Sequence, residues 1–376
     1  MSTLTIISHT EHYKSSDGTL VGLGSTITEI NHLLEIFDQI IHVGMFHEEE
    51  APPSALPYIS DRITFVALPA LGGHGFIDKV KILWNTPRVL KIVRNSINQA
   101  DYFQFRAPTG IGVFVLPYLT LFSSKKGWFK YAGNWKQKKA PLAYQFQRWW
   151  LKKQKRPVTI NGKWEDTPEH CLAFENPCLT EKEFIEGETC IENKQWNASE
   201  ISLCFVGRLE DQKGIGLLIE VLSRLDQNEK TKLKDIHIVG DGANVGTYKQ
   251  AASASGLNFV FHGVLSRKEV HRVYKISHAI VLPSASEGFP KVISEAMNYG
   301  CIPVVSNVSS ISNYVKDNIN GFLFYPITFE NLADKIKKIL NLTDLQYYNI
   351  IKSQNQELIK FTYSYYNKRI KEEILR

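Results

Sequence analysis

The chain has 376 residues, of which 43% are hydrophobic and 22% are charged. This composition excludes a disordered or fibrous protein, and the length exceeds what one compact core usually needs. The formal charge at pH 7 is +6, because 44 Lys and Arg residues outnumber 38 Asp and Glu residues. We therefore expect two globular domains.

Membrane-spanning and secreted classes are not favoured. The longest nearly uncharged apolar run, residues 110–122, is too short to cross a bilayer and contains Pro117. The amino terminus lacks a basic leader followed by a long apolar stretch, so no secretory signal is expected. The five cysteines include no C-x-x-C pair and are expected to be reduced thiols. These features predict a cytoplasmic protein without a transmembrane helix.

Apolar runs of strand length recur through the first half, separated by stretches of helix length. The predicted strands are Leu4–Ser8, Gln39–Val43, Thr64–Leu68, Tyr102–Arg106, Trp128–Ala132 and His170–Phe174. Apolar residues recur at three- and four-residue steps over Thr26–Phe37 and Val80–Asn95, which predicts two helices that cover a sheet. The alternation favours a parallel sheet in a first domain, residues 1–178.

The basic surplus lies in one segment. Between Lys125 and Arg156 there are 11 basic residues and no acidic residue, with Trp, Tyr and Phe interleaved. This mixture suits the headgroup layer of an anionic membrane, although about half of the aromatic residues could instead fill a core, as we expect for Trp128–Tyr131. No nucleic-acid-binding module is recognisable, so no nucleic-acid partner is expected. The predicted membrane-contacting residues are Lys125, Lys126, Trp135, Lys136, Lys138, Lys139, Trp149 and Trp150.

A second alternating pattern follows an interruption. Periodicity is lost between residues 175 and 200, which predicts a linker between the domains over residues 179–200. The next predicted strands are Ile201–Val206, Ile236–Val239, Phe259–Phe261, Ala279–Leu282, Ile302–Val305 and Phe322–Tyr325. A second α/β domain is thus expected over residues 201–358. The tail from Leu332 is helical by pattern with a break near Lys360–Tyr363, and its amphipathic last part, residues 359–376, could dock on another surface.

The stretch Pro283–Gly300 lies between two of these strands. Pro290 suits a first helical turn and Gly300 suits the position just past a helix, which predicts a helix over Pro290–Tyr299. Its amino end carries unpaired N–H groups and the positive end of the dipole, and Gly288 lets a ligand approach the backbone. Lys291 in the first turn opposes the dipole unless an anion binds there. Phosphate is the natural candidate.

Two carboxylates belong to this stretch. Glu287 precedes the helix and Glu295 lies within it eight positions later, so they would be about 12 Å apart along a continuous helix. Glycosidase carboxylates instead flank one bond at about 5 to 9.5 Å. The spacing therefore indicates contacts with two different hydroxyl groups of one extended ligand. Taken singly, either residue is as well explained as an exposed or helix-capping acid.

A second loop, Gly207–Gly214, follows the strand that ends at Val206 and places Arg208 and Lys213 just past its carboxyl end. Ligands bind beyond the carboxyl ends of strands in open parallel sheets. A guanidinium fork and an ammonium together suit a diphosphate, although a solvated turn would have the same composition. Gly240–Gly242 follows the next strand and adds flexible backbone at the same edge.

In this order, the loops resemble those of the family 4 glycosyltransferases, retaining enzymes of the GT-B fold with two Rossmann-like domains that face each other across a cleft. The resemblance spans nearly the whole second half. It is carried by Gly207-Arg208-Leu209, Lys213-Gly214, Gly240-Asp241-Gly242, Phe261-His262-Gly263-Val264, Pro283-Ser284, Glu287-Gly288-Phe289-Pro290, Glu295-Ala296-Met297, Gly300 and Asn320-Gly321. The Glu-x7-Glu pair is the family's signature.

The resemblance implies a catalytic set of Glu287, Arg208 and Lys213, of which the two cations hold the donor diphosphate. It further implies that Glu295 binds the ribose hydroxyls. The whole implied donor-binding set is Gly207, Arg208, Lys213, Gly240, Gly263, Val264, Glu287, Gly288, Phe289, Pro290, Lys291 and Glu295. In the first domain, Gly22, Gly24 and Arg106 would contact the acceptor, and the C-terminal helix would cross back to that domain.

The sequence departs from the family pattern at two places. His278 stands where the family often has Asp, and we expect its role to be structural. Ser309-Ser310 with Asn313 replace a frequent Gly-Gly and Glu, which puts donor contacts of that loop in question.

The expected activity is that of a retaining hexosyltransferase that needs no metal and no cofactor and moves a sugar from a nucleotide diphosphate donor to a hydroxyl acceptor. The sequence has no Asp-x-Asp pair for a divalent ion, so Arg208, Lys213 and helix dipoles would neutralise the leaving diphosphate. Together with the basic aromatic segment, this predicts a lipid-linked saccharide acceptor of capsule, O-antigen or lipopolysaccharide assembly, and peripheral contact with the inner face of the cell membrane.

Two other functions fit the same loops. A GT-B sugar nucleotide epimerase shares the donor chemistry but needs no acceptor. A noncatalytic nucleotide-sugar-binding scaffold would fit the altered Ser309–Asn313 loop. A nucleotide-dependent dehydrogenase is excluded, because Gly22-x-Gly24 lies far beyond its strand and lacks the third glycine.

Overall fold

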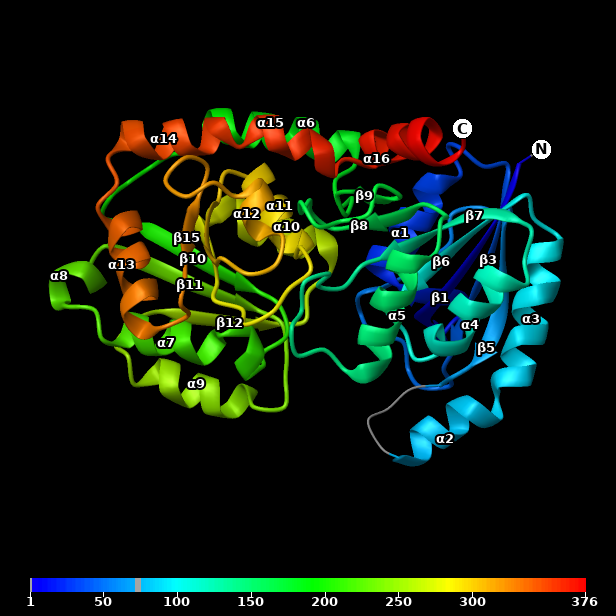
Figure 1. The fold of residues 1–376 in the computed structure, drawn as a ribbon. Coiled ribbons are helices and arrows are strands. Elements are labelled where there is room, and N and C mark those ends of the chain that lie inside the picture. The colour runs from blue at the N-terminus through cyan, green and yellow to red at the C-terminus, as the bar shows by residue number, and fades with distance from the viewer. Residues whose placement is uncertain (1, 72–75) are drawn as a thin grey trace. The chain divides into compact units, whose positions relative to one another are not determined.

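The structure, a computed structural model, describes residues 2–71 and 76–376, the side chains of residues 76–79 excepted. The chain divides into two compact units (Figure 1). The first is Met1–Asn176 with Tyr365–Arg376, and the second is Pro177–Ser364. Each unit contains a largely parallel sheet and its own hydrophobic core, which confirms the predicted class of two α/β domains.

The sheet of the first unit has a parallel part in the order β5-β3-β1-β6-β7-β8-β9. These strands are β1 (Thr3–Lys14), β3 (Gln39–Phe46), β5 (Ile63–Pro69), β6 (Tyr102–Ala107), β7 (Lys126–Tyr131), β8 (Val158–Ile160) and β9 (Cys171–Ala173). The far end of β1 pairs antiparallel with β2 (Leu20–Leu23), which pairs with β4 (Ala55–Pro57). All six strands predicted in this half are present. The missed strands β2, β4 and β8 have only three or four residues, too few for an apolar pattern.

The helices that accompany this sheet are α1 (Gly24–Leu33), α2 (Phe76–Trp84), α3 (Thr86–Asn98), α4 (Gly112–Leu121) and α5 (Leu142–Lys153). Helices α1, α3 and α4 of the first unit contribute buried apolar residues to its core. The last helix, α16 (Tyr363–Arg369), continues as a π-helical turn, Ile370–Ile374, and adds Tyr366 and Ile370 to the core of this unit.

The prediction of one helix over Val80–Asn95 is wrong, because the chain forms α2 and α3 with a break at Asn85. Pro87 lies in the first turn of α3, where a backbone N–H has no partner within the helix, so its missing N–H costs no hydrogen bond. Inside a continuous helix the same residue would remove a hydrogen bond and disfavour helical backbone in the residue before it. The apolar stripe runs across the break, so periodicity alone does not reveal it.

The aromatic residues of β7 confirm the plainer interpretation of that part of the basic segment. Trp128, Phe129 and Tyr131 are all fully buried in the core of the first unit. Lys130 between them is buried as well, and its Nζ lies 2.6 Å from Glu29 Oε1. A charge in this position is tolerated because it is paired.

The sheet of the second unit is parallel throughout, in the order β12-β11-β10-β13-β14-β15. Its strands are β10 (Ile201–Val206), β11 (Leu233–Val239), β12 (Phe259–Gly263), β13 (Ala279–Leu282), β14 (Ile302–Ser306) and β15 (Phe322–Phe324). All six match predicted strands. The order makes β10 and β13 neighbours at the point where the connections reverse direction, which is where open α/β sheets bind ligands.

Helices precede, connect and follow the strands of the second unit. They are α6 (Glu181–Asn193), α7 (Ile215–Ser223), α8 (Gln227–Lys230), α9 (Val245–Ser253), α10 (Arg267–Ile276), α11 (Lys291–Asn298), α12 (Ile311–Tyr314), α13 (Phe329–Leu340), α14 (Asp344–Ser353) and α15 (Asn355–Leu358). The predicted break near Lys360–Tyr363 is present, since Thr362 is extended between the 3-10 turn Ile359–Phe361 and α16. Among the described residues, no helix has the length and apolar character to span a bilayer.

Most of residues 179–200, the range predicted to be a linker between the domains, forms α6, and this helix belongs to the second unit. Thr180 and Glu183 form a capping box, in which each side chain accepts a hydrogen bond from the other's backbone N–H. Gly187 packs so closely on Asn298 that a Cβ would lie 2.3 Å from its carbonyl oxygen. Only Gly187 and Ile191 of this helix are buried, so its apolar periodicity is too weak to detect.

His278 is held by two backbone groups of the second unit. Its Nδ1 accepts from Ser202 N at 3.0 Å, and its Nε2 lies 3.1 Å from the carbonyl oxygen of Gln195. The first bond requires an unprotonated Nδ1, and the neutral ring can donate the second from Nε2. Burial, assisted by Lys194, lowers the pKa of His278 from 6.5 to about 4. These contacts give this departure from the family pattern a structural role.

We predict that acid destabilises the protein partly through His278. Because the folded-state pKa is lowered, the unfolded chain takes up the proton first, so stability is lost as the pH falls from about 6.5 to about 4. The loss should reach at most about 3 kcal/mol for this residue, measured by urea unfolding across that range. His278→Asn retains an acceptor for Ser202 N and should flatten the dependence. An identical pH dependence in this variant would contradict the prediction.

Candidate functional site

The loops after β10 and β13 meet at the carboxyl edge of the second sheet. Gly214, between the 3-10 turn Asp211–Lys213 and α7, has a φ of 79°, and a Cβ on it would lie 2.3 Å from the carbonyl oxygen of Pro283. Only glycine permits this approach. A backbone hydrogen bond from Ala285 N to Gln212 O, 2.8 Å long, joins the loops. The two stretches singled out from the sequence are therefore in direct contact.

This contact brings Lys213 and Glu287 together. Lys213 Nζ lies 2.5 Å from Glu287 Oε1, and both side chains are largely buried. Their ion pair places one positive and one negative group at the switch point of the sheet, a short distance along the chain from the start of α11. A ligand that carries both an anion and hydroxyl groups would find a partner for each.

The loops after β11 and β12 join the same edge through close backbone contacts. Gly240, with a φ of 131°, lies so near the loop after β10 that a Cβ would be 1.9 Å from Gly207 O. Gly240 N donates to Gly263 O at 2.8 Å, and Leu209 N donates to Asp241 O at 2.9 Å. Three of the predicted loops are thus connected to one another by main-chain hydrogen bonds, which places their backbones without any ligand.

We predict that Gly240→Ala destabilises the second unit by more than about 2 kcal/mol, since the methyl group meets backbone and the φ value disfavours any other residue. Equilibrium urea unfolding measures the change. Gly246→Ala is the matched control, because Gly246 lies within α9, has open space around it and should gain about 0.5 to 1 kcal/mol of helix propensity. Equal stability of the two variants would refute the close contact.

Helix α11 confirms the predicted helix to within one residue at each end. It begins at Lys291 with Pro290 as the N-cap residue, and Gly300 just beyond its end has a φ of 74°. No side chain caps its amino end. Phe289 is buried against Tyr314 and Phe361, at centroid distances of 4.8 and 4.9 Å. The loop that precedes the helix is therefore anchored from behind, while the helix start retains its dipole for an anion.

The serines that replace the family's frequent Gly-Gly keep a glycine-like backbone. Ser309 has a φ of 53°, in the left-handed region that favours glycine. The neighbouring Ser310 donates from Oγ to the carbonyl oxygen of Gly288 at 2.9 Å. The substituted loop thus supports the Glu287–Pro290 segment from a neighbouring strand.

Arg208 lies apart from the Lys213–Glu287 pair. Its side chain is 73% exposed, and Nη1 lies 2.9 Å from Glu210 Oε1. Val264 is also exposed, on the loop after β12. The structure therefore brings together Lys213 and Glu287 from the predicted catalytic set but not Arg208, and the roles of all three stay predictions.

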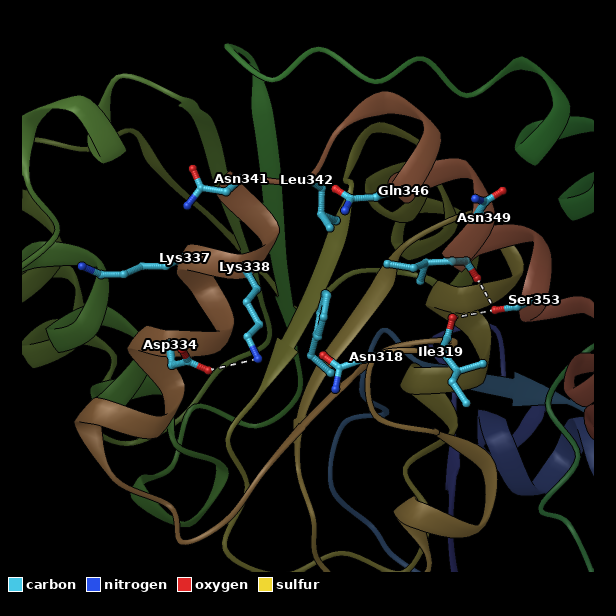
Figure 2. Close-up of a pocket in the computed structure, with 12 residues that line it drawn as sticks. Asn318, Ile319, Asp334, Lys337, Lys338, Asn341, Leu342, Gln346, Asn349 and Ser353 are labelled. Carbon is cyan, nitrogen blue, oxygen red and sulfur yellow. Dashed lines mark hydrogen bonds and ion pairs between the residues drawn. The ribbon is translucent and has the colours of Figure 1, made fainter.

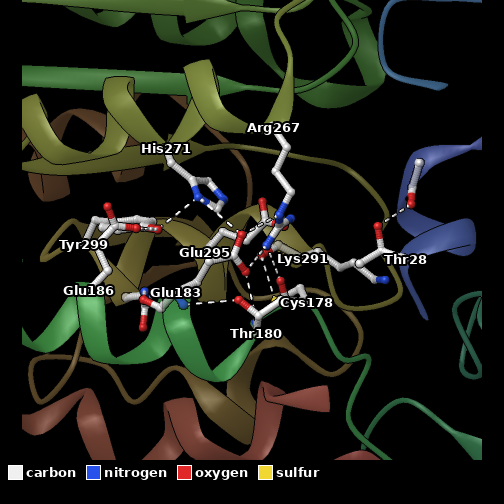
Figure 3. Close-up of polar contacts among 12 residues, drawn as sticks. Thr28, Cys178, Thr180, Glu183, Glu186, Arg267, His271, Lys291, Glu295 and Tyr299 are labelled. Carbon is white, nitrogen blue, oxygen red and sulfur yellow. Dashed lines mark hydrogen bonds and ion pairs between the residues drawn. The ribbon is translucent and has the colours of Figure 1, made fainter. Parts of the chain in front are cut away.

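Glu295 belongs to a buried ionic cluster that sequence reasoning missed (Figure 3). Arg267 donates from Nη1 to Glu295 Oε1 at 2.6 Å, and its Nε and Nη2 each lie 2.9 Å from an oxygen of Glu183. Nη2 also contacts the carbonyl oxygen of Cys178. One planar guanidinium thus fixes two carboxylates from different helices, a geometry that lysine could not reproduce.

Electrostatics favour the charged forms of Arg267 and Glu183. Burial alone would lower the pKa of Arg267, but Glu295 and Glu183 outweigh it and raise the pKa. Burial alone would raise the pKa of Glu183, but Arg267 outweighs it and lowers the pKa. Arg267 therefore holds the side chain of Glu295 in one orientation. The Thr-x-x-Glu spacing of the capping box was a sequence signal for Glu183, whereas Arg267 gave none.

The predicted acceptor-contacting residues of the first unit have internal partners. Arg106 donates to Gln104 Oε1 at 2.8 Å and to Glu29 Oε1 at 2.9 Å, in the cluster that includes Lys130. Gly22 lies in β2 against the ring of His12, and Gly24 starts α1 beside the carbonyl oxygen of Ser54. These contacts account for the residue types by packing, and acceptor contact stays a prediction for all three.

The predicted membrane-contacting residues differ in their surroundings. The prediction for Trp135 is wrong, since it is only 2% exposed and packs on Tyr131 at a centroid distance of 5.0 Å. Lys125 donates to the carbonyl oxygen of Ala100, and Lys136 pairs with Asp166. The residues among them that the structure leaves exposed are Lys126, Lys138, Lys139 and Trp149, and Trp150 is half-buried.

A separate hollow of about 800 Å³ lies among α13, α14 and the segment before β15 (Figure 2). Its polar lining is already engaged in part, because Lys338 pairs with Asp334 and Lys337 pairs with Glu229. The lining residues are distinct from those predicted to bind the donor. They are Asn318, Ile319, Phe322, Asp334, Lys337, Lys338, Asn341, Leu342, Gln346, Asn349, Ile350 and Ser353.

Comparison with solved structures decides the fold. Sucrose-phosphate synthase from Thermosynechococcus elongatus matches 99% of this chain and 98% of its own with a TM-score of 0.75 at 15% identity. Anabaena HepE in complex with UDP matches 99% of each chain with a TM-score of 0.69 at 15% identity. The chain has the GT-B fold.

Sequence comparison locates the similarity in the second unit. The family model described as "Glycosyl transferases group 1" matches residues 188–357. An uncharacterized 41.2 kDa protein in the cps region of Klebsiella pneumoniae is 28% identical over 43% of this chain and 41% of its own. The lipopolysaccharide 1,6-galactosyltransferase of Salmonella typhimurium is 30% identical over 36% of this chain and 39% of its own. The chain thus aligns with about two fifths of the length of these relatives.

Proposed function

We propose that the protein is a retaining glycosyltransferase that moves a sugar from a nucleoside diphosphate sugar to a hydroxyl group of a saccharide. The observation that carries this proposal is the meeting of Lys213, Glu287 and the start of α11 at the switch point of the second sheet. Support comes from the glycosyltransferase family model over this unit and from the UDP complex of HepE, which has the same fold.

In this proposal the donor diphosphate lies against the amino end of α11, with Lys213 as the adjacent cation. Glu295, oriented by Arg267, accepts hydrogen bonds from two ribose hydroxyls, and Glu287 contacts the transferred sugar. Arg208 reaches the diphosphate by rotation of its exposed side chain away from Glu210. These placements give each charged group of the ligand a partner of opposite charge.

The bond between the anomeric carbon and the diphosphate breaks, and a new bond to the acceptor oxygen forms on the same face of the sugar. The departing phosphate oxygen takes the acceptor proton, so no separate protein base is needed. Negative charge grows on the diphosphate as it leaves, and Lys213 with the α11 dipole stabilises it without a metal ion.

The acceptor that we propose is a lipid-linked saccharide used in surface polysaccharide assembly. The names of two relatives favour this class, since one acts on lipopolysaccharide and the other belongs to a cps region. Such an acceptor would place the enzyme at the inner face of the cell membrane.

We predict that a matching nucleoside diphosphate sugar raises the melting temperature. At one hundred times its Kd, this ligand should add about 2.7 kcal/mol to the free energy of unfolding. Lys213→Ala should weaken donor binding roughly tenfold or more, because a charge-assisted contact to phosphate is lost. Glu295→Ala should weaken it as well. Lys352→Ala, an exposed residue of α14, is the control and should bind as the parent does. A Lys213→Ala variant with unaltered affinity would sink the proposed site.

We further predict that turnover persists in excess chelator and that the product keeps the anomeric configuration of the donor. Product mass and proton NMR of the anomeric signal measure both. A donor of unchanged mass with the NMR signals of a different sugar would indicate an epimerase instead. Donor binding without turnover on any saccharide would indicate a noncatalytic binder, and inversion or complete loss with chelator would contradict the mechanism.

A further inference from the structure

The first unit has an apolar and basic surface that the transfer reaction does not use. It surrounds a hollow of about 460 Å³ between the carboxyl end of α4 and the last turns of α5, two helices that pack against each other (Figure 1). The hollow is lined by Thr120, Leu121, Trp149, Trp150, Lys153, Gln154, Lys155 and Arg156. We call the set Leu121, Phe122, Trp149, Lys153 and Lys155 the α4–α5 patch.

The apolar members of the patch are unusually exposed. Phe122 is 75% exposed, Leu121 is 65% exposed and Trp149 is 54% exposed. Large apolar side chains gathered in this way mark contact with another apolar phase. Leu121 is the last residue of α4 and Phe122 follows it, so their side chains can insert into an apolar phase while the helix backbone stays outside it.

Hydrogen bonds hold the patch in shape. Trp150 Nε1 donates to Thr120 Oγ1 at 2.9 Å, which joins α5 to α4. Arg156 donates to the carbonyl oxygens of Thr120 and Ser123, at 3.4 and 2.5 Å. The exposed side chains therefore stand on a fixed support, and they do not reach their positions through a loose loop.

The charged residues on α5 and on the segment that follows it up to residue 164 have one sign. Lys153 and Lys155 are exposed beside the hollow, and no Asp or Glu occurs anywhere from residue 102 to residue 164. Asp166, the second acid after this stretch, is paired with Lys136. Lysines that flank exposed Trp and Phe side chains match a surface with phosphate groups above hydrocarbon.

We propose that the α4–α5 patch is the surface by which the protein binds the anionic leaflet of a membrane. Leu121, Phe122 and Trp149 enter the boundary between headgroups and acyl chains, and Lys153 and Lys155 contact lipid phosphates. This inference deepens the proposed function and rests on it only for the purpose of the contact, which is access to a lipid-linked acceptor. The proposed membrane contact lies outside Lys125–Lys139, the segment in which most of the membrane-contacting residues were predicted from the sequence.

The test is flotation of the full chain with vesicles of phosphatidylglycerol mixed equally with phosphatidylcholine, at low salt. The parent protein should float with these vesicles and not with phosphatidylcholine alone. The pair Leu121→Ser with Phe122→Ser, and separately the pair Lys153→Gln with Lys155→Gln, should each reduce binding roughly tenfold or more. Raised salt should weaken binding by the parent.

Two matched pairs serve as controls. Leu345→Ser with Lys352→Gln changes an exposed Leu and an exposed Lys on α14 of the second unit and should bind as the parent does. Lys138→Gln with Lys139→Gln changes the predicted segment and should have a smaller effect than either patch pair. Melting temperature and donor stabilisation, measured on every variant, separate loss of the patch from loss of folding or of the donor site.

Three outcomes would overturn the proposal. These are failure of the parent protein to float with anionic vesicles, flotation of the patch variants equal to that of the parent, and loss of flotation in the Lys138/Lys139 pair alone. A patch that binds an acidic polysaccharide such as alginate but no vesicle would also overturn it and identify a different partner. None of these results would contradict the proposed donor site, because donor binding is measured separately by thermal stabilisation.

Discussion

Close backbone contact at the carboxyl edge of the second sheet is the constraint on which the rest of the site depends. Gly214 lies against Pro283, and Gly240 lies against Gly207, at separations that no side chain could enter. Four loops are drawn together by these contacts and by the hydrogen bonds between them. Lys213 and Glu287, far apart in the chain, become neighbours because their backbones have almost no freedom to separate.

Much of this arrangement could be predicted from the sequence, because the second unit has strong and regular signals. Its strands β10, β13 and β14 are buried on both faces and read as apolar runs, and Pro290 and Gly300 mark the ends of α11. Short strands such as β8 and the break at Asn85 lack signals of that kind. They depend on neighbours in space, which no local pattern encodes.

The candidate site, too, could be predicted from the sequence only in part. Glycine-rich turns and charged residues at strand ends indicated where the loops would gather, and Lys213 meets Glu287 there. The partners of Glu295 could not be inferred, since Arg267 and Glu183 reach it from separate helices. Arg208 lies in the predicted loop, but its side chain pairs with Glu210 at the surface. A motif specifies a backbone position more closely than it specifies a side-chain orientation.

The ion pair between Lys213 and Glu287 also bears on which anions the second unit can hold. The ammonium of Lys213 already pairs with a carboxylate 2.5 Å away, so in the proposed donor site a phosphate would have to replace Glu287 as its partner. The free energy gained is only the difference between two ion pairs, and it is small for a singly charged visitor. Under the proposed function, a diphosphate that also lies at the amino end of α11 would gain more than an anion that contacts Lys213 alone.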